Sequence, residues 1–273
     1  MRRFFILCFA CCSLSVGAEK LVSAGGSLTE IIFALGADDQ LVGVDSSSVY
    51  PLAAQELPNV GYYRALNVEG LLSVEPQRLL LLNGAGPQAV LNQAESLGLD
   101  ITVINNPKSI EGLYITIEEV ANATHKVDQG EQLISQIRGA LQSIDELSSV
   151  AGKSAVFLMS AGERGLVAAG ENTTPQLIFD QLALVNPFSS LEGFKSVSAE
   201  VLANAKPDII LLASHTTGDT SVEDLCADPQ LAIWASKNGC QLHKVDSLQF
   251  LGLTPRLPAA IEHTHNLLVN HAN

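Results

Sequence analysis

Short apolar runs alternate with amphipathic stretches along most of this chain. Apolar runs of about four to six residues predict buried strands, and apolar residues at three- and four-residue steps predict helices. This alternation is typical of α/β folds in which most strands are parallel. Strands are predicted at residues 21–24, 41–44, 78–82, 101–104, 154–159, 209–213 and 241–245. Helices are predicted at residues 28–35, 87–97, 175–182 and 258–270.

Capping residues in the sequence predict where two of the helices begin. Ser27 and Glu30 have the spacing of a capping box, in which each side chain bonds the backbone of the other residue. We therefore expect these two residues to cap the first helix. Asp228 is followed by Pro229, and this pair favours the first turn of a helix, so another helix is predicted to begin there.

The middle of the chain has a different pattern. Between residues 110 and 150 strand signals almost vanish, and apolar residues recur at helical steps. We therefore expect an N-terminal α/β lobe at residues 19–122, a connecting helix at 123–150 and a C-terminal α/β lobe at 151–273.

The two lobes resemble each other in sequence pattern. Glu69 stands seven positions before Pro76, Glu200 stands seven positions before Pro207, and a predicted strand follows each proline. The predicted fold is therefore α/β, with two similar lobes, mostly parallel sheets, a long inter-lobe helix and a ligand cleft between the lobes. In such folds ligands bind at the carboxyl ends of the strands.

The first 18 residues have the features of an export signal. Arg2 and Arg3 precede an apolar run that is too short to span a bilayer. Small residues before Glu19 predict cleavage after Ala18. A lipoprotein signal ending at Cys11 is the alternative, but the apolar run continues past that cysteine, so we favour a soluble exported protein.

The net charge bears on which partners the protein can bind, and the cysteine content bears on disulfide formation. The chain has 15 basic and 29 acidic residues, and loss of Arg2 and Arg3 would change the net charge from −14 to −16. Such an acidic protein is not expected to bind nucleic acid, whose phosphates need a basic surface.

After cleavage of the signal, Cys226 and Cys240 would be the only cysteines left in the chain. They are therefore a candidate disulfide, with two free thiols as the alternative.

The run Gly61-Tyr62-Tyr63-Arg64 supplies the most distinctive candidate chemistry. A phenol has a pKa of about 10, and a nearby cation favours the phenolate. Phenolate is an anionic ligand, and haem iron is held by tyrosine in some proteins. The triplet Tyr-x-Arg is therefore suited to ferric haem, although an ordinary surface loop with one half-buried tyrosine fits the same residues.

Loops after three predicted strands would line the cleft together with the Tyr62 loop. They lie at residues 83–87, 160–165 and 214–218. The candidate cleft contacts on them are Gly84, Ala85, Gly86, Arg164 and His215.

Several segments of the chain resemble the periplasmic haem-binding proteins of bacterial haem-uptake ABC transporters. That family lies within a wider class that also binds cobalamin and ferric siderophores. The segments that carry the resemblance are residues 22–32, 45–51, 60–66, 69–70, 84–87, 168–170 and 252–256.

The resemblance implies a role for each candidate residue. Tyr62 stands at the position of the axial iron ligand and Arg64 at that of its supporting arginine, while Tyr63, usually apolar in relatives, is the second candidate ligand. Arg164 would meet a haem propionate or stay solvated. His215 would make a second contact or remain a hydrogen-bonded loop histidine. Glu69 and Glu200 match the acidic residues that dock onto permease arginines.

The function implied is that of a binding protein and not an enzyme. It would bind ferric haem in the periplasm as a monomer and deliver it to an inner-membrane ABC permease dimer with its ATPase. Haem would be the transported ligand, and the iron of the haem would be the only metal bound. A cobalamin or ferric-siderophore carrier is the alternative within transport. An exported α/β hydrolase is a remote alternative, since the chain has no Gly-x-Ser-x-Gly motif.

Overall fold

The N-terminal lobe contains a fully parallel four-stranded sheet. The computed structural model describes residues 19–144, 148–161 and 165–270, so the predicted export signal and Arg164 lie outside the described residues. The strand order is β2-β1-β3-β4, and every neighbouring pair is parallel. The elements of this lobe are β1 (Leu21–Ala24), α1 (Gly26–Ala34), β2 (Leu41–Val44), α2 (Val68–Leu72), β3 (Arg78–Leu82), α3 (Gln88–Ser96) and β4 (Asp100–Ile104).

The C-terminal lobe contains a mixed five-stranded sheet in the order β7-β6-β5-β8-β9. Its strands are β5 (Ala155–Ser160), β6 (Leu166–Ala169), β7 (Phe194–Val197), β8 (Ile209–Ala213) and β9 (Leu242–Val245). Its helices are α6 (Thr174–Gln181), α7 (Ala199–Ala205), α8 (Val222–Ala227), α9 (Ala232–Asn238), α10 (Ser247–Leu251) and α11 (Leu257–Asn270). Strands β5, β8 and β9 pair in parallel, whereas β6 pairs with both of its neighbours antiparallel.

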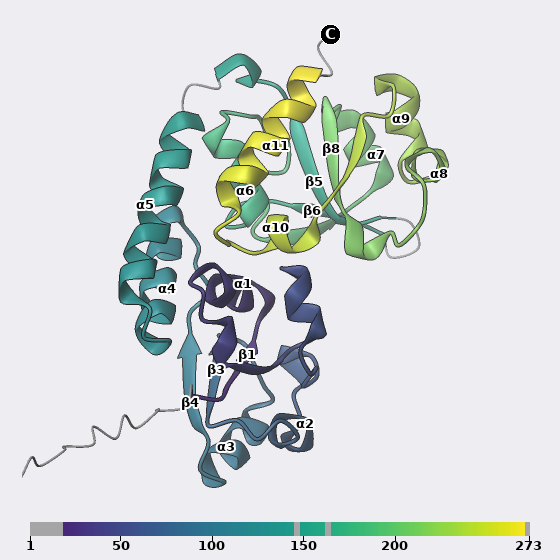
Figure 1. Cartoon of the computed structure of the whole chain (residues 1–273). Helices are drawn as coiled ribbons and strands as arrows, with labels where there is room; N and C mark the ends of the chain where they lie inside the picture. Colours follow the sequence, from purple (N-terminus) through teal and green to yellow (C-terminus); the bar gives the residue numbers. More distant parts are fainter. Residues whose placement is uncertain (1–18, 145–147, 162–164, 271–273) are drawn as a thin grey trace, which may run out of the picture.

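Two helices connect the lobes, and the second lies within residues 123–150, the range predicted for the connecting helix. Helix α4 (Ile110–Ala123) ends before a tight turn at His125, whose φ is +58°, and α5 (Val127–Ile144) follows. Helix α4 packs on α1 of the first lobe, and α5 packs on α11 of the second (Figure 1). The two helices approach closely at Gly130, where a Cβ atom would lie 2.6 Å from the Cβ of Ala121.

The helix starts differ from the prediction at two places. Helix α1 begins at Gly26 without a side-chain cap, so the expected capping box of Ser27 and Glu30 is wrong. Gly25 precedes it with a φ of +134°, and a Cβ there would lie 2.6 Å from the Cβ of Leu82. This tight turn determines where the helix starts. Asp228 is the C-cap residue of α8 and not the N-cap of the next helix, since α9 begins at Ala232 after Leu231.

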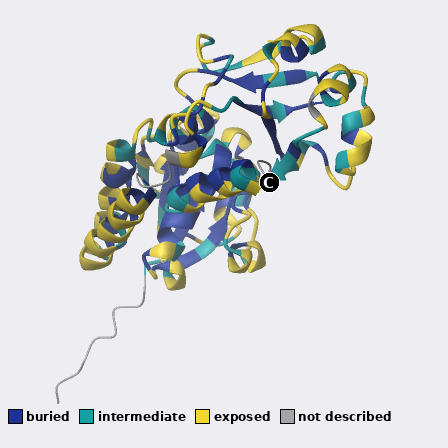
Figure 2. Ribbon diagram, turned by 90° about the horizontal axis from the view of Figure 1, so that it is seen from above, coloured by how far each residue is buried: buried dark blue, intermediate teal, exposed yellow. Residues whose placement is uncertain are grey.

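One apolar core extends through both lobes. It includes Leu28 and Ile32 of α1, Ile117 of α4, and Phe157 and Phe250 of the second lobe. The two phenylalanine rings stack with their centroids 6.0 Å apart. Figure 2 shows buried strands beneath helices whose outer faces are exposed. Among the described residues, no helix combines the length and apolar character that crossing a membrane requires.

Candidate functional site

The tyrosine loop lies at the carboxyl edge of the first sheet. The segment before it pairs with the end of β2, since the N–H of Val60 donates to the carbonyl of Val44 at 2.9 Å. Next to it, the N–H of Ser46 donates to the carbonyl of Gly61, at 2.9 Å. Tyr62 then precedes a short 3₁₀ turn that begins at Tyr63.

The structure brings the predicted glycine-rich loop against this turn. The N–H of Gly86 donates to the carbonyl of Tyr63 at 2.9 Å, and the N–H of Leu66 donates to the carbonyl of Gly86 at 2.8 Å. Gly84 and Ala85 precede Gly86 in the same loop, after β3. Two of the segments singled out in the sequence are therefore hydrogen-bonded neighbours.

The two phenols differ in their contacts. The Tyr62 side chain is 46% exposed, and its ring meets that of Tyr63 edge-on with centroids 5.0 Å apart. The Nε of Arg64 donates to the Tyr63 hydroxyl at 2.7 Å, and the guanidinium carbon lies 5.2 Å from the centre of the same ring. Arg64 thus contacts the second candidate phenol, and Tyr62 presents the more exposed one.

The pKa of Tyr62 is raised above its ordinary value of 10.0. Partial burial is the main cause, the neighbouring Tyr63 and Asp45 add to it, and Arg64 opposes it. Arg64 does lower the pKa of Tyr62, as expected from the sequence, but partial burial outweighs it, so the net direction is upward.

A buried carboxylate beneath the tyrosine loop was missed as a site residue. Asp45 is 1% exposed and directly follows β2. Its oxygens accept hydrogen bonds from the N–H of Gly25 at 3.0 Å and from the N–H of Tyr63 at 3.2 Å. The sequence signals were its place at the carboxyl end of a predicted strand and its place at the start of residues 45–51, one of the segments that carry the resemblance.

A second buried carboxylate joins the two lobes. Arg256, just before α11, donates through Nε and Nη2 to one oxygen of Glu30 in α1, at 3.0 and 2.9 Å. It also donates to Asp246 at 3.0 Å, and its guanidinium carbon lies 3.7 Å from the centre of the Tyr50 ring. Burial raises the pKa of Glu30, and the hydrogen bonds and charge of Arg256 oppose that rise.

His215 lies in the 3₁₀ turn that follows β8. Its backbone N–H donates to the hydroxyl of Ser247 at 2.9 Å, and its Nδ1 lies 2.7 Å from the same oxygen. Ser247 begins α10, and Leu248 of that helix approaches Gly26 of the first lobe. His215 is therefore a hydrogen-bonded loop histidine near the junction of the lobes. Its predicted role as a second ligand contact stays a prediction.

Glu69 and Glu200 occupy equivalent places in the two lobes. Each is exposed in the first turn of a short helix, α2 or α7, that leads into a parallel strand. Asn67 caps the first helix by accepting from Gly70, and Ser198 caps the second by accepting from Val201. The matching helix–strand units agree with the similarity of the lobes inferred from the sequence.

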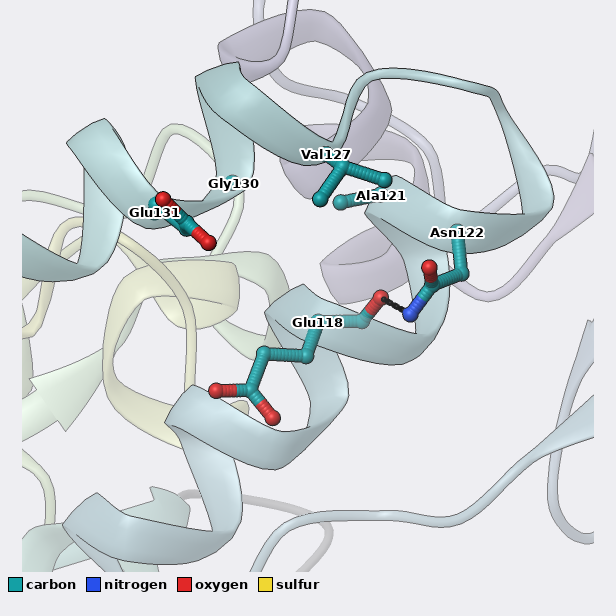
Figure 3. Close-up of a pocket in the computed structure, with 6 residues that line it drawn as sticks. All are labelled: Glu118, Ala121, Asn122, Val127, Gly130 and Glu131. Carbon is teal, nitrogen blue, oxygen red and sulfur yellow. Dashed lines mark hydrogen bonds between the residues drawn. The ribbon is translucent and has the colours of Figure 1, made fainter.

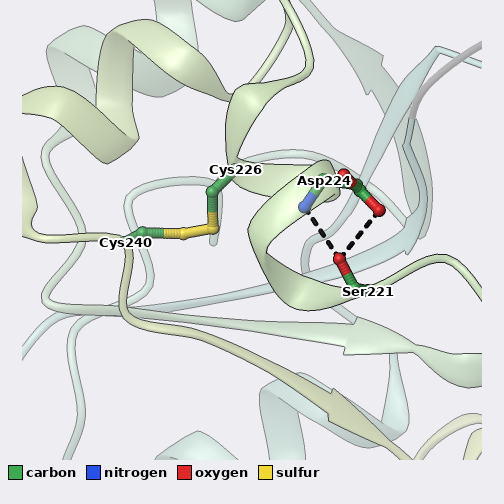
Figure 4. The surroundings of a disulfide bond; sticks show 4 residues. All are labelled: Ser221, Asp224, Cys226 and Cys240. Carbon is green, nitrogen blue, oxygen red and sulfur yellow. Dashed lines mark hydrogen bonds between the residues drawn. A yellow bond between two sulfur atoms is a disulfide. The ribbon is translucent and has the colours of Figure 1, made fainter.

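Cys226 and Cys240 form a disulfide with Cα atoms 6.0 Å apart (Figure 4). The bridge encloses α9, whose buried Trp234 donates to the carbonyl of Pro207 at 3.0 Å. Beside it, Ser221 caps α8 by accepting from the N–H of Asp224 at 3.0 Å. The disulfide thus braces the helices at the outer end of the C-terminal lobe.

A separate hollow of about 220 Å³ lies between α4 and α5, away from the tyrosine loop (Figure 3). It is lined by Glu118, Ala121, Asn122, Val127, Gly130 and Glu131. Across residues 19–144, 148–161 and 165–270, no three His, Cys, Asp or Glu side chains group in a way that would hold a metal ion.

The fold and loop geometry define a class of protein. A family model described as periplasmic binding protein matches residues 21–240, and the chain belongs to that family. The structure is similar to the periplasmic heme-binding protein RhuT from Roseiflexus sp. RS-1, with a TM-score of 0.85 and 30% identity over 94% of this chain and 100% of that one.

Further relatives agree on the family. The structure is similar to the periplasmic heme-binding protein HutB of Vibrio cholerae, with a TM-score of 0.83 and 30% identity over 92% of this chain and 99% of that one. In sequence the chain is 24% identical to a vitamin B12-binding protein of Vibrio campbellii over 199 residues, 72% of each chain. These matches confirm the resemblance and the two-lobe fold predicted from the sequence.

Proposed function

We propose that this protein binds ferric haem between its lobes through the phenolate of Tyr62 and delivers it to an inner-membrane ABC permease for haem and iron uptake. The observation that carries the proposal is the exposed Tyr62 beside Arg64, on a loop at the carboxyl edge of the first sheet. Support comes from two similar structures at 30% identity whose names state haem binding.

Ferric iron supplies the charge that the phenolate needs. The pKa of Tyr62 is raised, so its hydroxyl stays protonated at neutral pH. A bound metal cation reverses this preference because it stabilises the deprotonated ligand directly. Arg64 adds positive charge beside the phenols, and the fixed turn at Tyr63 holds Tyr62 at the edge of the loop. Tyr62 is the predicted axial ligand of the iron, and Arg64 is predicted to support its phenolate.

The protein would work in the periplasm as a monomer. Glu69 and Glu200 are exposed on corresponding helices of the two lobes, which suits contact with arginines of a permease dimer. Surface ion pairs of this kind add little affinity singly but set orientation and association rate.

Hemin titration tests the ligand and the iron contact together. Purified protein should shift the Soret band and give a phenolate-to-iron charge-transfer band. Tyr62→Phe should abolish the charge-transfer band, whereas Tyr114→Phe, a change at a buried tyrosine of α4, should leave it intact. A band retained in Tyr62→Phe and lost in Tyr63→Phe would move the ligand to Tyr63. No spectral change with the unaltered protein would refute haem binding.

A cobalamin carrier is the second candidate. It is favoured by relatives named as vitamin B12-binding proteins, at 24–27% identity. Saturable binding of cobalamin, together with no response to hemin, would establish it in place of haem.

A further inference from the structure

Asp45 combines full burial with an unusual set of partners. Its Oδ1 accepts from the N–H of Gly25 and from the hydroxyl of Ser48, at 3.0 and 2.8 Å. Its Oδ2 accepts from the N–H and the hydroxyl of Ser47, at 3.1 and 2.7 Å, and from the N–H of Tyr63, at 3.2 Å. Five donors therefore surround one carboxylate. None of the ion pairs found among the described residues involves Asp45.

These donors come from three separate segments. Gly25 belongs to the turn between β1 and α1, Ser47 and Ser48 to the loop after β2, and Tyr63 to the tyrosine loop. The network continues inward, since Ser48 contacts Thr29 of α1 at 2.7 Å between hydroxyl oxygens. Asp45 thus links the tyrosine loop to the buried Thr29 of α1 through Ser48.

We propose that Asp45 is the positioning residue of the iron-binding tyrosine, because its carboxylate fixes the Tyr62–Tyr63 backbone and places a negative charge behind the phenol. This inference rests on the proposed haem function. Buried polar groups are hydrogen-bonded in folded proteins, and leaving one unmatched is unfavourable. Here both carboxylate oxygens face only donors, so an amide cannot replace the carboxylate. In Asp45→Asn the NH₂ group would face either the donors around Oδ1 or those around Oδ2.

The negative charge of Asp45 should also affect the reduction potential of the bound haem, which the hydrogen-bond geometry alone would not. A fixed negative charge near the iron stabilises ferric haem relative to ferrous haem, because the ferric ion carries one more positive charge. Residues that orient a metal ligand typically change metal affinity by about 10- to 100-fold when altered. Asp45→Asn is therefore expected to weaken hemin binding about tenfold or more and to raise the reduction potential of the bound haem.

The test compares three proteins with and without hemin. The unaltered protein and Asp45→Asn are compared with Asp39→Asn, which removes one exposed carboxylate of the same lobe and serves as the matched control. Hydrogen exchange is first measured without hemin over residues 60–66. Faster exchange in Asp45→Asn, with Asp39→Asn unchanged, is the expected result. Hemin affinity, the charge-transfer band and the midpoint potential are then measured for each protein.

The outcomes separate this inference from the proposed function. If the unaltered protein does not bind hemin, the proposed function fails, while the exchange data still decide whether Asp45 holds the loop. If Asp45→Asn is folded by near-ultraviolet circular dichroism and matches the unaltered protein in exchange, affinity and potential, the inference is overturned.

If Asp45→Asn does not fold, the less disruptive variant Ser47→Ala tests the same inference. Ser47→Ala keeps the carboxylate and its charge but removes the hydroxyl that donates to Oδ2 and that accepts from the N–H of Gly26. It should speed exchange over residues 60–66 and weaken hemin binding about fivefold, as expected for the loss of one hydrogen bond to Asp45. Behaviour identical to that of the unaltered protein would also overturn the inference.

Discussion

Replacing Arg256 by methionine tests how the two lobes are held together. Arg256 contributes two hydrogen bonds to Glu30, one to Asp246 and a close contact with the Tyr50 ring. Methionine has a similar length and no charge, so Arg256→Met removes these interactions while filling much of the space. Glu30 would then be left 2% exposed with no cation beside it.

The expected loss follows from the fate of the Glu30 carboxylate. Removing one partner of a buried ion pair usually destabilises a protein by about 3–5 kcal/mol. Glu30 has an ordinary pKa of 4.5, and protonating it at pH 7 costs about 3.4 kcal/mol at 1.36 kcal/mol per pH unit. Protonation therefore limits the carboxylate part of the loss to about that value. The lost contact with Tyr50 adds about 1 kcal/mol.

The loss should depend on pH in a defined direction. Burial raises the folded pKa of Glu30 even beside Arg256, and removing Arg256 raises it further. A carboxyl with a raised folded pKa stabilises the fold fully below its unfolded pKa, and that contribution is lost as the pH rises through the folded pKa. The destabilisation of Arg256→Met should therefore be largest at pH 7 and above and should shrink as the pH falls toward 4.5.

Urea denaturation at several pH values measures this effect. The double variant Glu30→Gln with Arg256→Met carries no buried charge, so its loss should be about 2 kcal/mol smaller than the sum of the two single losses. Arg78→Met is the control, because its acidic partners Glu19 and Asp100 are 32% and 58% exposed and the loss of these ion pairs should cost about 1 kcal/mol. A loss for Arg256→Met below 1 kcal/mol, or one independent of pH, would refute the reasoning.

Three further outcomes are expected. Replacing Cys226 and Cys240 by serine should lower the free energy of unfolding by about 3 kcal/mol for a loop of 14 residues, as measured in urea, and reduction of the unaltered protein should have the same effect. Reduction of bound haem should weaken binding, because phenolate prefers ferric iron; equal ferrous and ferric affinities would contradict the tyrosine ligand. Glu69→Lys with Glu200→Lys should abolish transport by the reconstituted permease without changing hemin affinity, and loss of both would point to misfolding instead of docking.

Periodicity predicted most of the fold because the parallel strands are short, continuous and buried. Seven strands appear within one residue of their predicted bounds. The antiparallel strands β6 and β7 were missed. Strand β7, Phe194–Val197, is half-buried at its ends and exposed between them, so it has no continuous apolar run. Helical spacing was recognised from residue 110 onward and the connecting helix was placed at 123–150, which contains α5, but α4 was not predicted as a separate helix.

The side-chain partners of the site could not be predicted in the same way. Glu30 stands at the correct spacing from Ser27 for a capping box, yet it bonds Arg256, which lies 226 residues further along the chain. Arg64 stands beside both phenols in sequence and contacts Tyr63. Local spacing limits which contacts are within reach, whereas the packing of distant segments decides which ones form.

The two buried carboxylates of the first lobe illustrate different solutions to the same electrostatic problem. Asp45 receives five neutral donors from its own lobe, and Glu30 receives a cation from the other lobe. The first arrangement holds the tyrosine loop on its sheet independently of the second lobe. The second arrangement sets how the lobes meet and also places Arg256 against Tyr50. A change at Asp45 should therefore alter the proposed iron contact while the lobes stay joined, and a change at Arg256 should loosen the lobes while the tyrosine loop keeps its hydrogen bonds.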